Sequence, residues 1–137
     1  MKIDEIQNEI IAEFSGLHDW FDKYRYLIDL GKRYAPPGES FRTDNNAMPG
    51  CQSHVWIAAE LKENRLHYTV DSDSIIIRGI LVLLLRIMDN RSPDEIAHAD
   101  LFFIERTGLN TSLSPARADG IAAIVKKMRG YGTAVRE

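Results

Sequence analysis

The chain has a single cysteine, Cys51, and so no second thiol with which to form an internal disulfide. Structural zinc and iron–sulfur sites take several cysteine or histidine ligands, and the four histidines here are scattered, none three or four residues from another. We therefore expect no disulfide and no bound metal. One free thiol is typical of a protein of a reducing compartment, and the cytoplasm is the expected location.

Long apolar runs and an excess of basic residues are also missing. The one candidate membrane segment is Ile75–Leu85, which is shorter than the roughly 20 apolar residues of a spanning helix and is interrupted by Arg78. We expect it to form a buried helix, and we expect no signal peptide in the charged first ten residues. With a net charge of −3 and no basic stripe, neither nucleic acid nor an anionic membrane is an expected partner.

The length and the pattern of apolar residues predict one α+β domain over residues 1–137. A chain of 137 residues that is 45% hydrophobic and 27% charged suits a single globular domain. Between Ser53 and Val70 the apolar period is two, with a break at Lys62–Asn64, which predicts a β-hairpin. Helical periodicity predicts helices in residues 3–14, 17–30, 75–85 and 115–130. We expect a small antiparallel sheet packed against these helices.

Helix boundaries are marked by polar residues and glycine. Asp71–Ser74 supplies oxygens that can cap the apolar helix, and Ser92–Glu95 has the pattern of a capping box. Asp100 is expected to cap a further short helix. We expect the last helix to stop at Gly130, so that residues 130–137 form a flexible tail. Arg78, inside an apolar helix, needs an acidic partner or a route to solvent.

Cys51 is the main candidate for chemistry. It follows Pro49-Gly50, which predicts a turn, and precedes the first predicted strand. A reactive thiol needs access and a neighbour that stabilises its anion, for which Arg42 and His54 are close in sequence. Three interpretations remain open: an inert buried thiol, an acceptor that works by thiol exchange, and a Cys51–His54 dyad that hydrolyses a small ester or amide.

Five segments together resemble the SufE family of sulfur-acceptor proteins in iron–sulfur cluster assembly. They follow in the family's order at nearly the family's spacing, and they cover almost the whole chain. The segments are EIIAEFSGLHDWFDKYRYLIDLGKRY (9–34), FRTDNNAMPGCQS (41–53), GCQSHVW (50–56), DSDSIIIRGILVLLL (71–85) and LSPARADGIAAIV (113–125).

The resemblance implies a fold similar to that of the IscU scaffold and a role for Cys51 as a persulfide acceptor. A partner cysteine desulfurase, SufS- or CsdA-like, would strip sulfur from L-cysteine. Cys51 would take that sulfur, which stimulates the desulfurase, and would pass it to a downstream iron–sulfur scaffold complex. Pyridoxal phosphate would belong to the desulfurase, so this chain is expected to be a carrier without a cofactor and not an enzyme.

The resemblance also implies roles for the residues around Cys51. Loop-shaping or partner contacts would fall to Asn46, Gly50, Gln52, Ser53 and His54, and a further partner contact to Arg117. The last motif departs from the family pattern in two places, since Ala116 precedes Arg117 and Asp119 precedes Gly120. These departures concern details of partner contact and leave the cysteine motif untouched.

Overall fold

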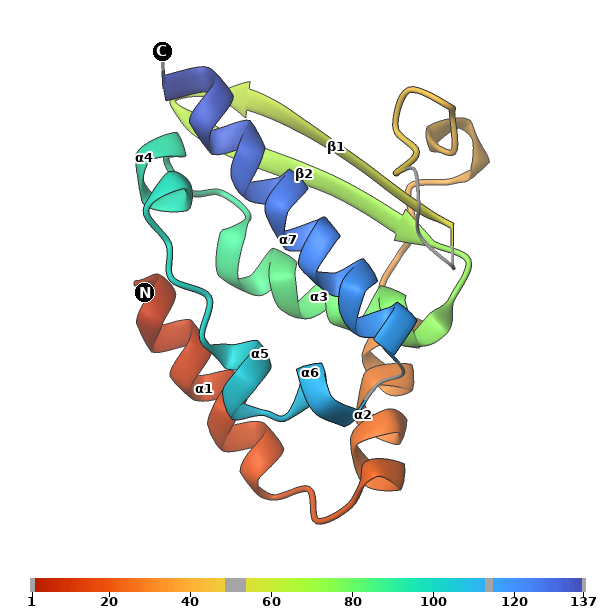
Figure 1. Cartoon of the computed structure of the whole chain (residues 1–137). Coiled ribbons are helices and arrows are strands. Elements are labelled where there is room, and N and C mark those ends of the chain that lie inside the picture. The colour runs from red at the N-terminus through yellow and green to blue at the C-terminus, as the bar shows by residue number, and fades with distance from the viewer. Residues whose placement is uncertain (1, 49–53, 113–114, 137) are drawn as a thin grey trace.

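The computed structural model describes residues 2–48, 54–112 and 115–136, and there a two-stranded sheet packs against helices (Figure 1). The predicted α+β class is confirmed. The elements are α1 (Ile3–Ser15), α2 (Trp20–Arg33), a 3-10 turn η1 (Glu39–Phe41), β1 (Val55–Lys62), β2 (Arg65–Ser72), α3 (Ile75–Met88), α4 (Pro93–Ala97), α5 (Phe103–Arg106), α6 (Leu109–Ser112) and α7 (Pro115–Arg136). None of the described helices combines the length and the apolar character needed to cross a bilayer.

The hairpin has the two faces that its alternating sequence predicts. β1 and β2 are antiparallel, and Glu63 and Asn64 join them with φ values of 54° and 63°, as in a two-residue hairpin turn. One face carries buried residues such as Ile57 opposite Val70. The other face carries Trp56 opposite Asp71. Because a strand alternates its side chains, this register separates the core from the polar face that bears the candidate site.

The apolar run predicted to be a buried helix is α3, which lies between the sheet and α2. Ser74 begins it, because its hydroxyl accepts a hydrogen bond from the amide of Ile77 at 3.3 Å. α2 and α3 approach backbone to backbone at Gly31 and Gly79. A Cβ added to Gly79 would lie 2.1 Å from the carbonyl oxygen of Leu27, so only glycine fits this crossing.

The predicted run Asp71–Ser74 does cap α3, through Ser74, but two of the aspartates expected to cap a helix do not. Asp71 does not cap α3; its carboxylate is buried and bonded to arginines, as described below. Asp100 does not cap α5, whose start is held by Gln7 from α1. The side chain of Gln7 donates to the carbonyl of Asp100 at 2.9 Å and accepts from the amide of Phe103 at 3.1 Å. In both cases a residue distant in sequence replaces the local contact that the pattern favoured.

The last helix is longer than predicted. Its buried face contains Ile121, Ile124 and Met128, as the periodicity indicates. It does not stop at Gly130, however, and residues 130–136 are helical, not a loose tail. The continuation packs on α4: a Cβ on Gly132 would lie 2.9 Å from the carbonyl oxygen of Pro93. This packing supports the helix beyond a glycine that would otherwise favour its end.

We expect the ion pair between α1 and α3 to make stability depend on acid pH. Arg86 donates two hydrogen bonds to Glu13, at 3.1 and 2.9 Å, and these bonds hold the pKa of Glu13 below its usual value of 4.5. The carboxylate of Glu13 is therefore protonated more readily in the unfolded chain than in the folded one. The stabilisation of the fold by the ion pair is thus present above about pH 4.5 and is lost as the pH falls below it. Glu13 is more than a third exposed, so the effect is well under ~1 kcal/mol.

Urea unfolding between about pH 3 and pH 6 measures the contribution of this ion pair to the free energy of unfolding. Glu13→Gln should flatten the fall in unfolding free energy at acid pH. Glu60→Gln is the matched control, since Glu60 is exposed and forms no ion pair with a described residue. Equal pH profiles for Glu13→Gln and the unaltered protein would contradict the assignment.

Candidate functional site

The two ends of the segment that contains Cys51 are held together by backbone hydrogen bonds. The amide of Met48 donates to the carbonyl of Val55 at 2.8 Å, and the amide of Ile57 donates to the carbonyl of Asn46 at 2.8 Å. Ala47 thereby forms a bridge with Trp56 beside β1. The predicted site residues Gly50, Cys51, Gln52 and Ser53 lie outside the described residues. We call this pair of bonds between residues 46–48 and 55–57 the clamp.

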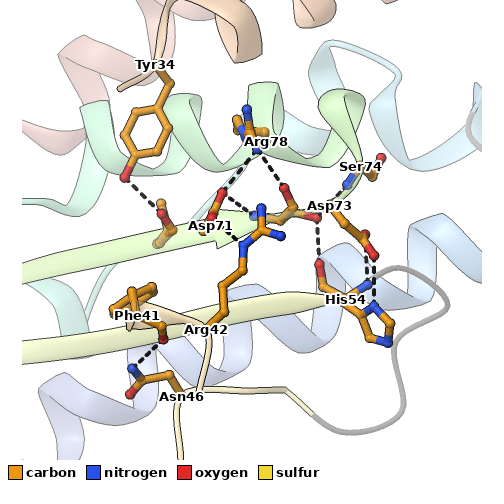
Figure 2. Close-up of polar contacts among 11 residues, drawn as sticks. Tyr34, Phe41, Arg42, Asn46, His54, Asp71, Asp73, Ser74 and Arg78 are labelled. Atoms are coloured by element: carbon orange, nitrogen blue, oxygen red, sulfur yellow. Dashed lines mark hydrogen bonds and ion pairs between the residues drawn. The ribbon is translucent and has the colours of Figure 1, made fainter. Parts of the chain in front are cut away.

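His54 is fixed at the downstream end of that segment (Figure 2). Asp73 receives a hydrogen bond from the His54 amide at 3.1 Å, and its other carboxylate oxygen lies 2.8 Å from Nδ1 of the imidazole. The carbonyl of His54 accepts from the Ser72 hydroxyl at 2.8 Å and from the Asp73 amide at 3.2 Å. The imidazole itself remains exposed at the surface. The end of β2 and the residue that follows it thus hold His54 through both its backbone and its imidazole ring.

A buried carboxylate, Asp71, lies between two arginines from different parts of the chain (Figure 2). Its side chain is 1% exposed. Arg42, from the segment before the clamp, donates from Nε at 2.9 Å, and Arg78, from α3, approaches with Nη2 at 3.3 Å. Arg78 also donates to the carbonyl of Ser72 at 3.1 Å. Asp71 therefore links the segment that leads to Cys51 to the first turns of α3, and it supplies the acidic partner that Arg78 was expected to need.

Arg42 binds the upstream segment to the polar face of the hairpin, and the Asn46 side chain makes a hydrogen bond within that segment. The guanidinium of Arg42 lies over the indole of Trp56, 4.6 Å from the ring centroid, while its Nε bonds Asp71. The Asn46 side chain donates to the carbonyl of Phe41 at 2.9 Å (Figure 2). The charged side chains of the site are thus two arginines and the carboxylates of Asp71 and Asp73, and the guanidinium of Arg42 is part-exposed beside the upstream segment.

The described histidines other than His54 do not join this group, and the prediction for Arg117 lies outside the described side chains. Arg117 lies in the first turn of α7, and its side chain is outside the described part of the chain. His67 is on β2, and His98 follows α4. In the ranges that the structure describes, no three side chains of the metal-ligating types gather closely enough to hold a metal ion. The site is thus a framework of hydrogen bonds and arginines around a thiol-bearing segment.

The sequence offers Asp71 and Asp73 as a cation or acid/base pair, but helix capping is the favoured interpretation, so neither is predicted as a site residue. Both fall in a polar run before an apolar helix, where capping is the common use of aspartate. The signal that could have found Asp71 is the strand register. Counting back from the hairpin turn places Asp71 opposite Trp56, on the same face as the segment that carries Arg42.

Replacing Asp71 with asparagine is expected to destabilise the protein by about 2–3 kcal/mol, because two largely buried arginines lose their counter-charge. Both arginines keep some contact with water, which limits the loss. Asp73→Asn is the matched control: that carboxylate is exposed, and its loss should change stability by less than ~1 kcal/mol. Urea unfolding of both variants tests this. Equal losses would show that Asp71 does not hold the two arginines.

Comparisons with known proteins show what this chain is similar to. Residues 8–132 match the model of the SufE family, described as an Fe-S metabolism associated domain. An uncharacterised SufE-like protein of Rhizobium etli is 37% identical over an alignment of 127 positions, which covers 89% of this chain and 86% of that protein. The solution structure of a hypothetical protein from Thermus thermophilus superposes with a TM-score of 0.74 over 94% of both chains. Its sequence is 14% identical to this chain, so the similarity shows the fold alone.

Proposed function

Since this chain belongs to the SufE family and so has a role in iron–sulfur metabolism, we propose that it accepts sulfur on Cys51 from a cysteine desulfurase. It releases the desulfurase for another turnover and passes the sulfur to an iron–sulfur scaffold complex. Pyridoxal phosphate belongs to the desulfurase in this proposal, and the present chain acts as a carrier in the cytoplasm.

The transfer is a thiol exchange that needs no oxidant. The Cys51 thiolate attacks the terminal sulfur of the desulfurase persulfide. A new S–S bond forms on Cys51, the S–S bond on the desulfurase breaks, and its electron pair leaves with the desulfurase thiolate. The product is a Cys51 persulfide. The chain must therefore present a thiolate to another protein and stabilise an anion before and after the transfer.

The observation that carries the proposal is the clamp around the only cysteine. Cys51 is three residues from Met48 and three from His54, and the clamp and Asp73 hold these two ends. Arg42 and Arg78, joined through Asp71, bring guanidinium groups beside the upstream end. A short segment with anchored ends limits the loss of conformational freedom when a partner docks. Asn46 has a positioning role in this proposal, since it joins the clamp to Phe41.

Intact-mass spectrometry under non-reducing conditions tests the proposal. The protein is incubated with L-cysteine and a cognate desulfurase, and then with the desulfurase alone. We expect a gain of one or more sulfur atoms only when L-cysteine is present, reversed by reductant and mapped to the peptide that contains Cys51. An active desulfurase that leaves the mass unchanged would contradict sulfur acceptance.

A second candidate function has one observation in its favour. Asp73 lies 2.8 Å from Nδ1 of His54, which is how a carboxylate orients the base of a cysteine hydrolase. Cys51 and His54 would then cleave a small ester or amide without a partner. His54→Gln separates the two functions: we expect it to keep sulfur acceptance, because the exchange needs no base at this position. Turnover of a thiol-reactive ester such as p-nitrophenyl acetate that depends on both Cys51 and His54 would favour the hydrolase.

A further inference from the structure

The outward face of α7 has two hollows that neither the core nor the clamp uses. One, of about 590 Å³, lies beside α4 and is lined in part by Ala97, Val125 and Thr133. The other, of about 560 Å³, lies over α7 itself. Lys126, Gly130 and Ala134 line both hollows, so the two meet at Gly130. We call this surface the α7 face.

Gly130 has no explanation within the described molecule. Glycine is less favourable than alanine inside a helix, yet Gly130 stands within α7. A Cβ added there would meet no atom within 4 Å. Gly132, in the same helix, differs, because a Cβ at that position would press on α4. The absent side chain of Gly130 therefore serves no internal contact and instead leaves the helix backbone open to close approach from outside.

The rim of the α7 face is positively charged and unbalanced. Lys126, Lys127 and Arg129 surround the hollows, and none forms an ion pair with a carboxylate that the structure describes. α7 contains five basic residues and one acidic residue, although the whole chain has a net charge of −3. The helix dipole favours cations only in the last turn, and Lys126 lies almost three turns before Arg136. This rim would attract the complementary negative charge of another molecule.

The small lining residues form one stripe along α7. Ala123, Gly130 and Ala134 are separated by seven and four residues, which places them on one helix face against which a second helix can pack. We propose that the α7 face docks an acidic amphipathic helix of a partner protein. Small apolar side chains of that helix enter the hollows at Gly130, and its carboxylates lie opposite the basic rim. A second α7 would bring cations against cations, so self-pairing is disfavoured.

The α7 face is separate from the clamp. The C-terminal part of α7 lies by the turn end of the hairpin, whereas the ends of the Cys51 segment lie at the opposite end of β1 (Figure 1). The eight residues of β1 span about 26 Å. Two partners can therefore be bound at once, and the inference does not rest on sulfur transfer by Cys51.

Two-dimensional NMR of the full chain tests the inference. The probe is a synthetic helical peptide of about 20 residues, with leucine and alanine on one face and glutamate on both flanks. A matched peptide carries lysine in place of each glutamate. We expect saturable shifts confined to residues 122–134 and to Ala97 of α4 with the acidic peptide only, weakened strongly at about 0.5 M salt. Shifts elsewhere, equal binding of the lysine peptide, or no binding of either peptide would overturn the proposal.

Variants distinguish docking from a structural role of the same residues. Gly130→Leu fills the junction of the hollows with a good helix former, so it should abolish binding while the Tm stays or rises. Lys126→Glu combined with Lys127→Glu should weaken binding roughly tenfold, whereas Lys32→Glu on α2 should not. Unchanged affinity of Gly130→Leu would overturn the proposal. So would tighter binding of an RNA oligonucleotide or of anionic phosphatidylserine vesicles on this face, or concentration-dependent dimerisation in sedimentation.

Discussion

Replacing Cys51 with serine is expected to abolish sulfur acceptance completely while leaving the fold unchanged. The substitution exchanges one atom, but a serine hydroxyl is a far weaker acid than a thiol and is not ionised at neutral pH. It also cannot form the S–S bond of a persulfide. The chain has no second cysteine to take over the role. With an active desulfurase and L-cysteine, the mass of Cys51→Ser should therefore stay constant.

Two measurements keep this result interpretable. Unfolding of Cys51→Ser in urea should match that of the unaltered protein, because the clamp at Met48 and Val55 is a backbone contact. Stimulation of desulfurase turnover should be lost together with the mass gain. A Cys51→Ser protein that still stimulated the desulfurase would contradict the carrier mechanism, since activation would then come from docking alone.

Replacing Gly79 with alanine is expected to be the most destabilising single substitution considered, with a loss of more than about 3 kcal/mol. The added Cβ would lie 2.1 Å from the carbonyl oxygen of Leu27 and 2.8 Å from its carbonyl carbon, and both atoms belong to the backbone of α2. A side chain can rotate away from an intruding atom, whereas a helix backbone can yield only if the whole helix moves. α2 and α3 must therefore separate, with loss of core packing.

The matched control is the same substitution at Gly130. A Cβ there meets nothing within 4 Å, and alanine is about 1 kcal/mol more favourable than glycine within a helix. Gly130→Ala should thus raise the Tm, while Gly79→Ala lowers it or prevents folding. Thermal unfolding followed by circular dichroism compares the two. A small effect of Gly79→Ala would mean that α2 and α3 cross at a greater distance.

The sequence predicted the elements well because their signals are local. Apolar spacing of three and four residues placed α1 and α3, and alternation placed the hairpin within two residues of its ends. The predicted stop at Gly130 was wrong for the opposite reason. A glycine ends a helix when nothing else supports it, but here α4 packs on the next turn at Gly132. That contact joins residues far apart in the chain, and no local pattern reports it.

The framework of the site was harder to predict for the same reason. Arg42 and Asp71 are 29 residues apart and meet only because the segment before the clamp crosses the polar face of the hairpin. The sequence predicts His54 as a site residue, but it favours a cap for its partner Asp73, since an aspartate before a helix ordinarily has that use. The resemblance to a family supplied the role of Cys51, and the roles of Gly50, Gln52, Ser53 and Arg117 stay predictions.

In most hairpins the length of the loop sets the register of the strands. The clamp makes the length of the segment that contains Cys51 independent of the register of β1 and β2. The hydrogen bond from Met48 to Val55 closes a ring of chain outside the β1–β2 ladder. Residues inserted into that ring would lengthen it without shifting Trp56 from its place opposite Asp71. Closing a longer ring is inexpensive, at about 0.6 kcal/mol for each doubling of its length. The reach of the thiol toward a docked protein can therefore evolve, or be engineered, independently of the fold that carries it.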